Sequence, residues 1–373
     1  MLLKKISILA MIFIFTGVFT ITGINLNNIS SEVTYEKGGP LRIGYVESEE
    51  FPLYTSLITN IAKDFQKMGV LDSYNIDEFN KSANEVWNEM CDHCISNDYK
   101  FIKDMFYNLK DTNESIYKSA VNNESVDLVL VMGTTAGKYF ADKETKNKFM
   151  VFAAADPIRS GIIKSETEKY NKNAFAHLDP NKYVRQIQAG HRLLNFKKVG
   201  VVFEKNEDAY AYSAIGDLLD QSKKLNFEVV IRNVSEAKND NDYGRYYRDL
   251  TNAYKELVDE KIDMLYMTTA TIQNEKIPDI LGKDIYKNNI PVLAQTDESQ
   301  VECGATVGIT MYDFLEQAAF AVNQIKSYRE GTPFEDLEQT NESTAKIYLN
   351  YNIAKKLGID IPLSTLLIVD KIY

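Results

Sequence analysis

Short apolar runs alternate along this chain with longer amphipathic segments, and this alternation predicts its secondary structure. Short apolar runs are typical of strands buried on both faces of a parallel sheet, whereas apolar residues at helical spacing are typical of covering helices. We expect strands at 41–46, 126–132, 149–155, 199–203, 228–234, 264–267 and 291–294, and helices at 53–68, 210–225 and 246–259. This order predicts an α/β fold with mostly parallel sheets. Residues 72–125 are polar, and we expect them to be helical and exposed.

One sequence pattern occurs twice along the chain. An aliphatic residue followed by Asp127 opens a strand that leads to two threonines, a helix, and a second strand that ends at Asp156. Asp263 opens a second passage of the same kind, which ends at Asp297. The repeat indicates either two similar lobes or a chance likeness between two Rossmann-like units. Because ligands bind beyond the carboxyl ends of strands in open α/β sheets, two facing lobes would surround one cleft with Thr134, Thr135, Asp156 and Asp297.

Length and charge narrow the class of protein. The chain has 373 residues, and chains of this length usually form two domains. Its formal net charge is −11, which argues against nucleic acid as a partner because phosphates require a basic face.

The N-terminus indicates export. Lys4 and Lys5 precede an apolar run over 6–24, which is the pattern of a signal segment and is nearly long enough to span a bilayer. Residues 1–30 are therefore expected to be a cleaved signal peptide or an uncleaved membrane anchor, and the sequence leaves both open. The rest of the chain is expected outside the cytoplasm, on the outer face of the cell membrane or in a periplasm.

Several candidate residues lie at predicted strand ends. Thr134 and Thr135 begin a predicted helix, where backbone N–H groups attract a carboxylate, although either threonine would serve equally as a plain helix cap. The carboxylates of Asp156 and Asp297 would accept hydrogen bonds from an ammonium or hydroxyl group. Asp156-Pro157 is also a common turn sequence, and both interpretations stay open.

Catalytic and metal motifs are absent from the sequence. His93, His177 and His191 belong to no catalytic motif, and no G-x-S-x-G, phosphate-binding P-loop or H-E-x-x-H occurs. Cys91 and Cys94 are spaced for a local disulfide or a pair of free thiols, and no second ligand pair accompanies them for a metal site. We therefore expect no enzyme activity, no metal and no cofactor.

Four stretches resemble the ABC-transporter substrate-binding proteins of the family that includes tryptophan and tyrosine binders. They are 131–137 (VMGTTAG), 152–161 (FAAADPIRSG), 290–299 (IPVLAQTDES) and 349–362 (LNYNIAKKLGIDIP). The resemblance covers the chain from residue 41 nearly to its end and is weakest over 70–125. It implies a type I periplasmic-binding-protein fold, with one lobe at 41–158 plus 310–335 and the other at 175–308 plus 340–373.

The resemblance also implies a set of ligand-binding residues. On the first lobe these are Glu50, Thr134, Thr135, Asp156 and Pro157, on the second they are Glu207 and Asp297, and Tyr312 is an aromatic residue near the hinge. Three dipeptides depart from the family pattern, namely 209–210, 270–271 and 310–311. These departures leave the fold untouched but put an aromatic amino acid ligand in doubt.

The function implied is that of a monomeric, exported solute-binding protein. It would bind a small polar ligand, an amino acid or a similar molecule, and deliver it to a membrane permease of an ABC importer. The alternative is a ligand-sensing module that an uncleaved N-terminal helix tethers to the membrane.

Overall fold

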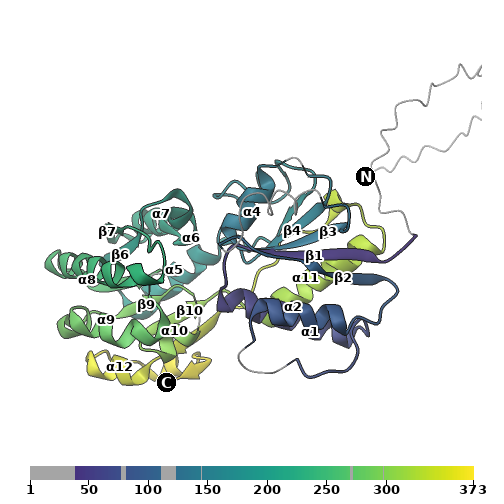
Figure 1. Cartoon of the computed structure of the whole chain (residues 1–373). Helices are drawn as coiled ribbons and strands as arrows, with labels where there is room; N and C mark the ends of the chain where they lie inside the picture. The colour runs from purple at the N-terminus through teal and green to yellow at the C-terminus, as the bar shows by residue number, and fades with distance from the viewer. Residues whose placement is uncertain (1–37, 77–80, 111–122, 144, 269–271, 297) are drawn as a thin grey trace, which may run out of the picture. The chain divides into compact units, whose positions relative to one another are not determined.

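The computed structural model describes residues 38–76, 81–110, 123–143, 145–268, 272–296 and 298–373. The expected export segment lies outside these residues. Residues 37–373 form one compact unit. Figure 1 shows the two sheets of this unit in separate lobes, each flanked by helices.

The sheet of the first lobe is wholly parallel. Its strand order is β2-β1-β3-β4-β5, and each neighbouring pair runs in the same direction. The strands are β1 (Leu41–Glu47), β2 (Tyr99–Asn108), β3 (Leu128–Met132), β4 (Lys148–Phe152) and β5 (Ala174–Ala176). The central strands β3 and β4 are buried almost throughout, as their apolar runs predict.

The sheet of the second lobe is parallel except at one pair. Its order is β12-β11-β10-β9-β8-β6-β7, and only β10 and β11 run antiparallel among the strands described. The strands are β6 (Lys198–Glu204), β7 (Glu228–Val234), β8 (Met264–Met267), β9 (Val292–Ala294), β10 (Val307–Thr310), β11 (Lys346–Leu349) and β12 (Lys371–Ile372). The two sheets confirm the expected α/β class with mostly parallel strands.

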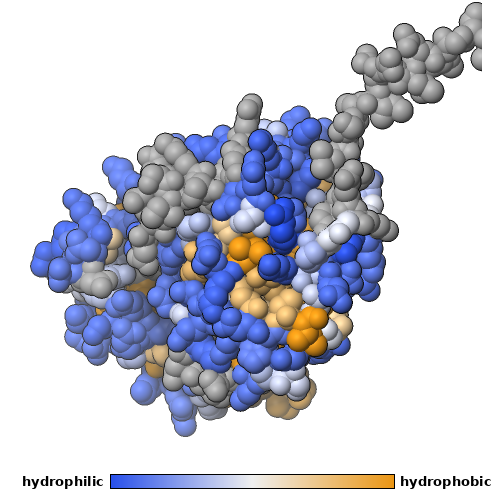
Figure 2. All heavy atoms as spheres, turned by 45° about the vertical axis from the view of Figure 1, so that its right-hand side comes forward, coloured by the Kyte–Doolittle hydropathy of each residue, from blue (hydrophilic) through white to orange (hydrophobic). Residues whose placement is uncertain are grey.

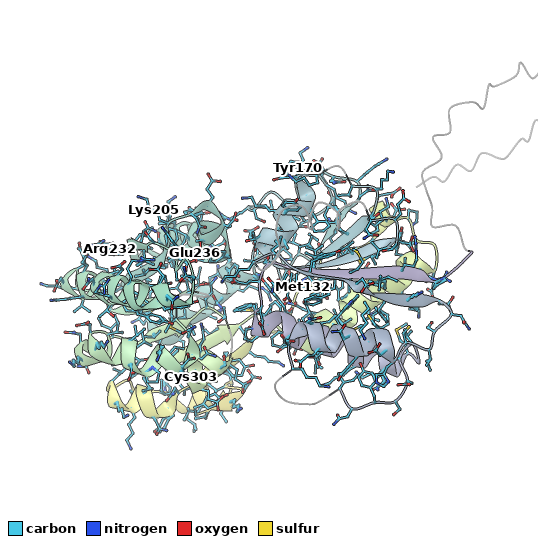
Figure 3. All side chains as sticks on the ribbon, in the orientation of Figure 1. Met132, Tyr170, Lys205, Arg232, Glu236 and Cys303 are labelled. Atoms are coloured by element: carbon cyan, nitrogen blue, oxygen red, sulfur yellow. The ribbon has the colours of Figure 1, made fainter. Side chains whose placement is uncertain are left out.

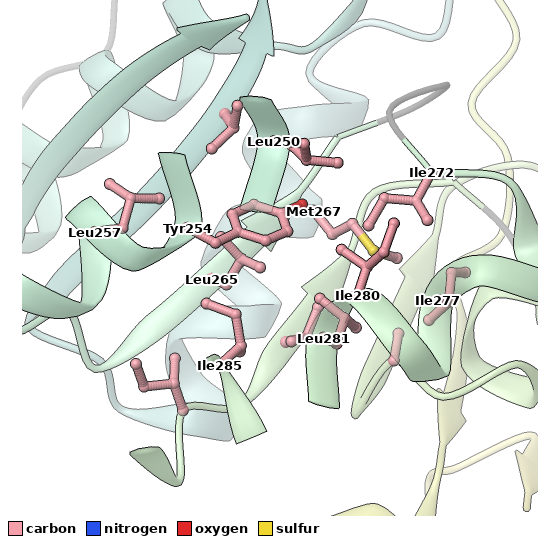
Figure 4. Close-up of a cluster of buried hydrophobic side chains, with 14 of the residues drawn as sticks. Leu250, Tyr254, Leu257, Leu265, Met267, Ile272, Ile277, Ile280, Leu281 and Ile285 are labelled. Carbon is pink, nitrogen blue, oxygen red and sulfur yellow. The ribbon is translucent and has the colours of Figure 1, made fainter. Parts of the chain in front are cut away.

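Helices cover these sheets with apolar faces. They are α1 (Pro52–Lys67), α2 (Ala83–Asp92), α4 (Thr134–Ala141), α5 (Lys182–Leu194), α6 (Glu207–Tyr212), α7 (Ile215–Leu225), α8 (Tyr243–Asp259), α9 (Ile277–Lys283), α10 (Glu298–Glu302), α11 (Phe314–Arg329), α12 (Tyr351–Lys356) and α13 (Leu363–Leu366). Figure 4 shows one resulting core, in which side chains of α8 and α9 pack with Leu265 and Met267 of β8. Hydrophilic side chains dominate the outer face seen in Figure 2.

The aspartate that opens each copy of the repeated pattern makes the same kind of contact in both lobes. In the first, Asp127 accepts hydrogen bonds from the backbone N–H of Arg42 in β1 (2.9 Å) and from its guanidinium. In the second, Asp263 accepts from the backbone N–H of Lys198 in β6 (2.9 Å) and of Lys197. Each aspartate therefore fixes the start of its own strand against the neighbouring central strand.

The expectation that residues 72–125 are helical and exposed is wrong for much of that stretch. The helix α2 begins with a capping box, in which Ser82 and Glu85 exchange hydrogen bonds, and it buries Trp87 completely. The strand β2 follows and pairs with β1 along the edge of the sheet. The sequence pattern did not predict β2 because charged residues interrupt its apolar ones. These charged residues occupy the outer positions of an edge strand, whereas Phe101 and Met105 face the core.

The chain passes between the lobes more than once. Strand β5 pairs with β4, so the first sheet continues to residue 176, beyond the expected boundary between 158 and 175. The backbone hydrogen bonds to β4 place these residues there. After β10 of the second sheet, α11 returns to pack on α1 of the first lobe, and β11 then rejoins the second sheet.

Candidate functional site

The carboxyl ends of strands in one lobe lie near those of the other. In Figure 3, Met132 marks the carboxyl end of β3, and Glu236 lies beyond β7 on the side of the second lobe that faces the first. Lys110 follows β2, and a hydrogen bond from its ammonium group to Glu49 raises its pKa. Glu236 is close enough to Lys110 to add a smaller effect in the same direction. This is the arrangement that places ligands between lobes in such folds.

A pocket of about 220 Å³ lies where three segments meet. They are the loop after β4, the connection from β5 into α5, and the start of α7 in the second lobe. Its lining residues are Ala155, Asp156, Pro157, Ile158, Arg159, Glu166, Leu178, Asp179, Pro180, Asn181, Lys182, Tyr183 and Asp217. The pocket is thus built from both lobes and from the crossover between them, and its walls mix acidic, basic and apolar groups.

Asp156 organises the first wall of this pocket. Its Oδ1 accepts hydrogen bonds from the backbone N–H groups of Ile158 (3.1 Å) and Arg159 (2.9 Å), and its Oδ2 lies 3.2 Å from Nε of Arg159. The residue therefore forms a turn and lines the pocket at once. Pro157 is buried and also lines it.

The start of α4 is arranged differently from a threonine-capped helix. Gly133 takes the N-cap position with φ of 93°, and a side chain there would meet the hydroxyl of Tyr54. Thr134 is buried, and its Oγ1 accepts a hydrogen bond from the backbone N–H of Ala155 (3.1 Å). The hydroxyl of Ser48 accepts from the backbone N–H of Ala136 (2.9 Å), so one of the expected anion donors already has a partner. Thr135 is exposed.

Three tyrosines lie close to one another, and one of them, Tyr183, lines the pocket. Burial raises the pKa of Tyr312, and Tyr54 and Tyr183 are close enough to add to the effect. The hydroxyl of Tyr312 is buried and has no hydrogen-bond partner within the described part of the chain. Burial also raises the pKa of Tyr183, with Asp156 adding to the effect. These phenols stay neutral and present hydroxyl donors beside aromatic surface.

Two further predicted residues, Glu50 and Glu207, do not line this pocket. Glu50 is exposed in the loop after β1, and Glu207 is exposed as the first residue of α6. Asp297 lies outside the described residues. The neighbour of Glu207, Asp208, does reach the other lobe, because its carboxylate pairs with Lys138 of α4.

Ion pairs of Lys138 and of Arg159 join the lobes. Nζ of Lys138 lies 2.6 Å from Oδ1 of Asp208, and Nη2 of Arg159 lies 2.9 Å from Oδ1 of Asp217 in α7. All four side chains are partly exposed to solvent. The structure therefore represents a form in which the two sides of the cleft touch.

The sequence pattern missed most of the pocket's charged residues. Lys182 and Asp217, like the neighbouring Tyr183, belong to no motif, and each resembles an ordinary surface residue in its own segment. The FAAADPIRSG stretch pointed to another charged residue of the pocket, since it contains Arg159.

No cysteine or histidine is among the described residues that line the pocket. Cys91 and Cys94 are free thiols, and Sγ of Cys94 donates to the backbone carbonyl of Tyr99 (3.3 Å). His177 is buried, and its Nε2 lies 3.3 Å from the carbonyl oxygen of Asn341. His191 packs edge-on against Phe196.

Comparison with known proteins assigns the family. The family model described as ABC transporter substrate binding protein matches residues 90–372. The chain belongs to this family. Its members are solute-binding proteins, and their location is extracytoplasmic. No curated protein matches the sequence.

Solved structures of substrate-binding domains share the fold of this family member. An ABC domain from Streptococcus pneumoniae in complex with L-Trp is 18% identical over 90% of this chain and 100% of its own, with a TM-score of 0.67. A ligand-free, open substrate-binding protein with adhesive properties from Clostridium difficile is 19% identical over 89% of this chain and 98% of its own, with a TM-score of 0.61. These likenesses confirm the expected two-lobed fold of the type I periplasmic-binding-protein kind.

Within the described residues, no helix of this substrate-binding protein is both long and apolar enough to cross a membrane.

Proposed function

We propose that this protein is the extracytoplasmic solute-binding component of an ABC importer. It would hold a small polar ligand, an amino acid or a similar molecule, in the pocket between its lobes. The observation that carries the proposal is the pocket itself, because residues of both lobes and of the crossover line it with charged and apolar groups together. A ligand that touches all three segments favours the form in which they meet.

The mechanism would be hinge closure. In an open form the pocket is accessible, and in the form described here Lys138–Asp208 and Arg159–Asp217 bridge the lobes. A bound ligand adds contacts that exist only in the closed form and shifts the population toward it. A membrane permease would then receive the closed, loaded protein.

The ligand-binding set stays as the resemblance implied it. We propose Asp156, Pro157 and Tyr312 near the pocket, and Thr134, Thr135, Glu50, Glu207 and Asp297 around the remaining cleft. Asp297→Ala should weaken ligand binding about 30-fold or more if its carboxylate faces an ammonium, because a buried charge would lose its partner. Unchanged affinity, measured by calorimetric titration, would remove Asp297 from the set.

We also propose the division into lobes at 41–158 plus 310–335 and 175–308 plus 340–373, except that β5 (Ala174–Ala176) goes to the first lobe instead of the second because it pairs with β4. The protein would act as a monomer on the outer side of the cell membrane or in a periplasm. The N-terminal segment would direct its export.

The test is native mass spectrometry of the protein purified from its own cells. A co-purified small molecule, released on denaturation and identified, is the expected result. Titration of that molecule into stripped protein should then decrease the radius of gyration measured by X-ray scattering. A protein that carries no molecule, and whose radius responds to no solute of the growth medium, would contradict the proposal.

One sequence feature supports a second function, that of a tethered ligand sensor. The apolar run over 6–24 is nearly long enough to remain as a membrane anchor. Sequencing the N-terminus of the mature protein distinguishes the two. A retained Met1 with no uptake defect on deletion of the gene would favour the sensor.

A further inference from the structure

Most acidic residues that line the pocket form an ion pair with an arginine. Asp156 and Asp217 both contact Arg159, at 3.2 Å and 2.9 Å, and Asp179 forms an ion pair with Arg185. Three of the four acidic residues that line the pocket thus have a guanidinium partner. The fourth, Glu166, is exposed.

Lys182 is the exception among the cations. It lines the pocket half-buried, and no carboxylate among the residues that the structure describes forms an ion pair with it. Its Nζ has one long hydrogen bond, 3.4 Å, to the carbonyl oxygen of Ala154, and it lies 4.8 Å from the ring centroid of Tyr183. An ammonium group has three donors, so most of its hydrogen-bonding capacity is unused.

The position of Lys182 disfavours its positive charge when no ion-pair partner is present. It is the first residue of α5, where the partial positive charge of a helix N-terminus disfavours a cation. Burial lowers the pKa of Lys182, and the nearby carboxylates of Asp179, Asp156 and Asp217 oppose that effect. The same ammonium on the outer face of α5 would be hydrated and would avoid both costs.

We propose that Lys182 binds the carboxylate of the ligand, which rests on the proposed function as a solute-binding protein. Neither the sequence motifs nor the family match assigns this binding residue.

The remaining charges limit the ligand further. Four acidic and two basic side chains line the pocket, so its walls repel a group with two negative charges. A single carboxylate is favoured over a phosphate, and a cationic group elsewhere on the same molecule is favoured because Glu166 lies at the exposed rim without an ion-pair partner among the described residues. Apolar walls from Pro157, Leu178 and Pro180 would contact the rest of the molecule.

This proposal competes with the one in which Thr134 and Thr135 hold the carboxylate. Oγ1 of Thr134 accepts a hydrogen bond from the backbone N–H of Ala155, so this hydroxyl has a single donor left for a ligand. The N–H of Ala136 in the same helix start donates to Ser48. Lys182 brings a full positive charge and several unused donors, so the two models predict different variants to fail.

The experiment uses the full chain and a defined probe set. Each of the twenty common L-amino acids is tested by calorimetric titration, and the tightest binder is compared with its α-amide, which lacks the carboxylate. Variants are Lys182→Met, which removes the charge, Lys182→Arg, which keeps it, and Lys255→Met, a control at an exposed lysine of α8. Thermal melts of the ligand-free forms check folding.

The expected result is a loss of at least about 30-fold in affinity for Lys182→Met, a smaller loss for Lys182→Arg, and no change for Lys255→Met. Wild type should bind the acid much more tightly than the amide, and Lys182→Met should lose that preference. The melting temperature without ligand should stay the same or rise in Lys182→Met, since a half-buried charge without an ion-pair partner among the described residues is removed.

Two results would overturn the inference in distinguishable ways. If Lys182→Met binds the amino acid as wild type does and still rejects the amide, Lys182 is not the carboxylate-binding residue, whereas the solute-binding function stands. If wild type binds none of the amino acids, both the inference and an amino acid ligand are contradicted.

Discussion

Nζ of Lys138, in α4 of the first lobe, lies 2.6 Å from Oδ1 of Asp208, in α6 of the second lobe. The side chains are 33% and 30% exposed, so solvent screens the pair. Such pairs contribute about 0.2–1 kcal/mol, which is small for folding but matters for a balance between open and closed forms. The pair forms only when the lobes meet, and it therefore acts on closure rather than on either lobe's core.

The first prediction concerns this pair. Lys138→Asp should weaken ligand binding several-fold, because it replaces an attraction between lobes with a repulsion, and Asp208→Lys added to it should restore most of the loss. Titrations at low and high ionic strength should show a smaller effect at high salt. Equal affinities in all three proteins at low salt would contradict a role in closure.

The second prediction concerns Gly216, near the start of α7. A side chain at this position would lie 2.0 Å from Nη1 of Arg159, which must then move away from Asp217. Gly216→Ala should leave the melting temperature of the ligand-free protein unchanged or raise it, because alanine favours a helix by up to ~1 kcal/mol. It should nevertheless weaken ligand binding several-fold.

Gly244→Ala is the matched control for this variant. Gly244 also lies in the first turn of a helix, α8, and nothing lies within 4 Å of an added side chain. The control should show the same stability gain without the loss in affinity. If both variants bind alike, the contact between Arg159 and α7 does not influence the ligand.

The third prediction concerns acid stability. His177 is 6% exposed and packs against Phe320, with a ring distance of 5.2 Å. Burial, with a smaller effect of Lys182, lowers the pKa of His177 to about 4. The unfolded chain therefore binds this proton more readily than the folded protein does, and the stabilising effect is present above pH ~6.5 and lost as the pH falls toward 4.

The loss for His177 is at most about 3 kcal/mol, since each pKa unit corresponds to about 1.4 kcal/mol. Urea unfolding of wild type and His177→Gln between pH 7 and pH 4 measures it. The wild type should lose stability faster than the variant over this interval. Parallel curves would show that His177 is protonated as easily in the folded protein as in the unfolded chain.

The fourth prediction concerns the two neighbouring cysteines. Burial, with a smaller effect of Asp92, raises the pKa of the Cys91 thiol to about 12, so little thiolate exists at neutral pH. Alkylation of Cys91 at neutral pH, followed by mass spectrometry, should be slow in the folded protein and fast in urea.

Cys91→Ser with Cys94→Ser should leave ligand affinity within a few-fold, because neither residue lines the pocket. Loss of binding in a folded double variant would show that α2 contributes to the site.

The fold was readable from the sequence where strands are buried on both faces. Residues 264–267 were expected as a strand and form β8 with the same bounds, because every position there is apolar and buried. Strand β2 was missed because Lys100, Lys103 and Asp104 interrupt its apolar residues. At the edge of a sheet one side of a strand meets water, and the pattern then resembles that of a polar loop or helix.

The site was readable only where a motif marked it. Asp156 and Pro157 belong to a recognisable stretch, and both line the pocket. Lys182 had no such signal, since a lysine at the start of a helix normally points into water. Its surroundings depend on segments far apart in the chain, near Asp156 and near Asp217, and local patterns do not encode that proximity.

The return of α11 to the first lobe determines the order in which the molecule can be completed. Helix α11 packs on α1, and Phe320 contacts Phe175 of β5, yet α11 follows nearly the whole second lobe in the chain. A nascent chain that emerges from its N-terminus therefore carries a first lobe with one side bare until residues 314–329 have appeared. The first lobe therefore completes its packing late in synthesis, and until then the surface of α1 that α11 covers is open to aggregation.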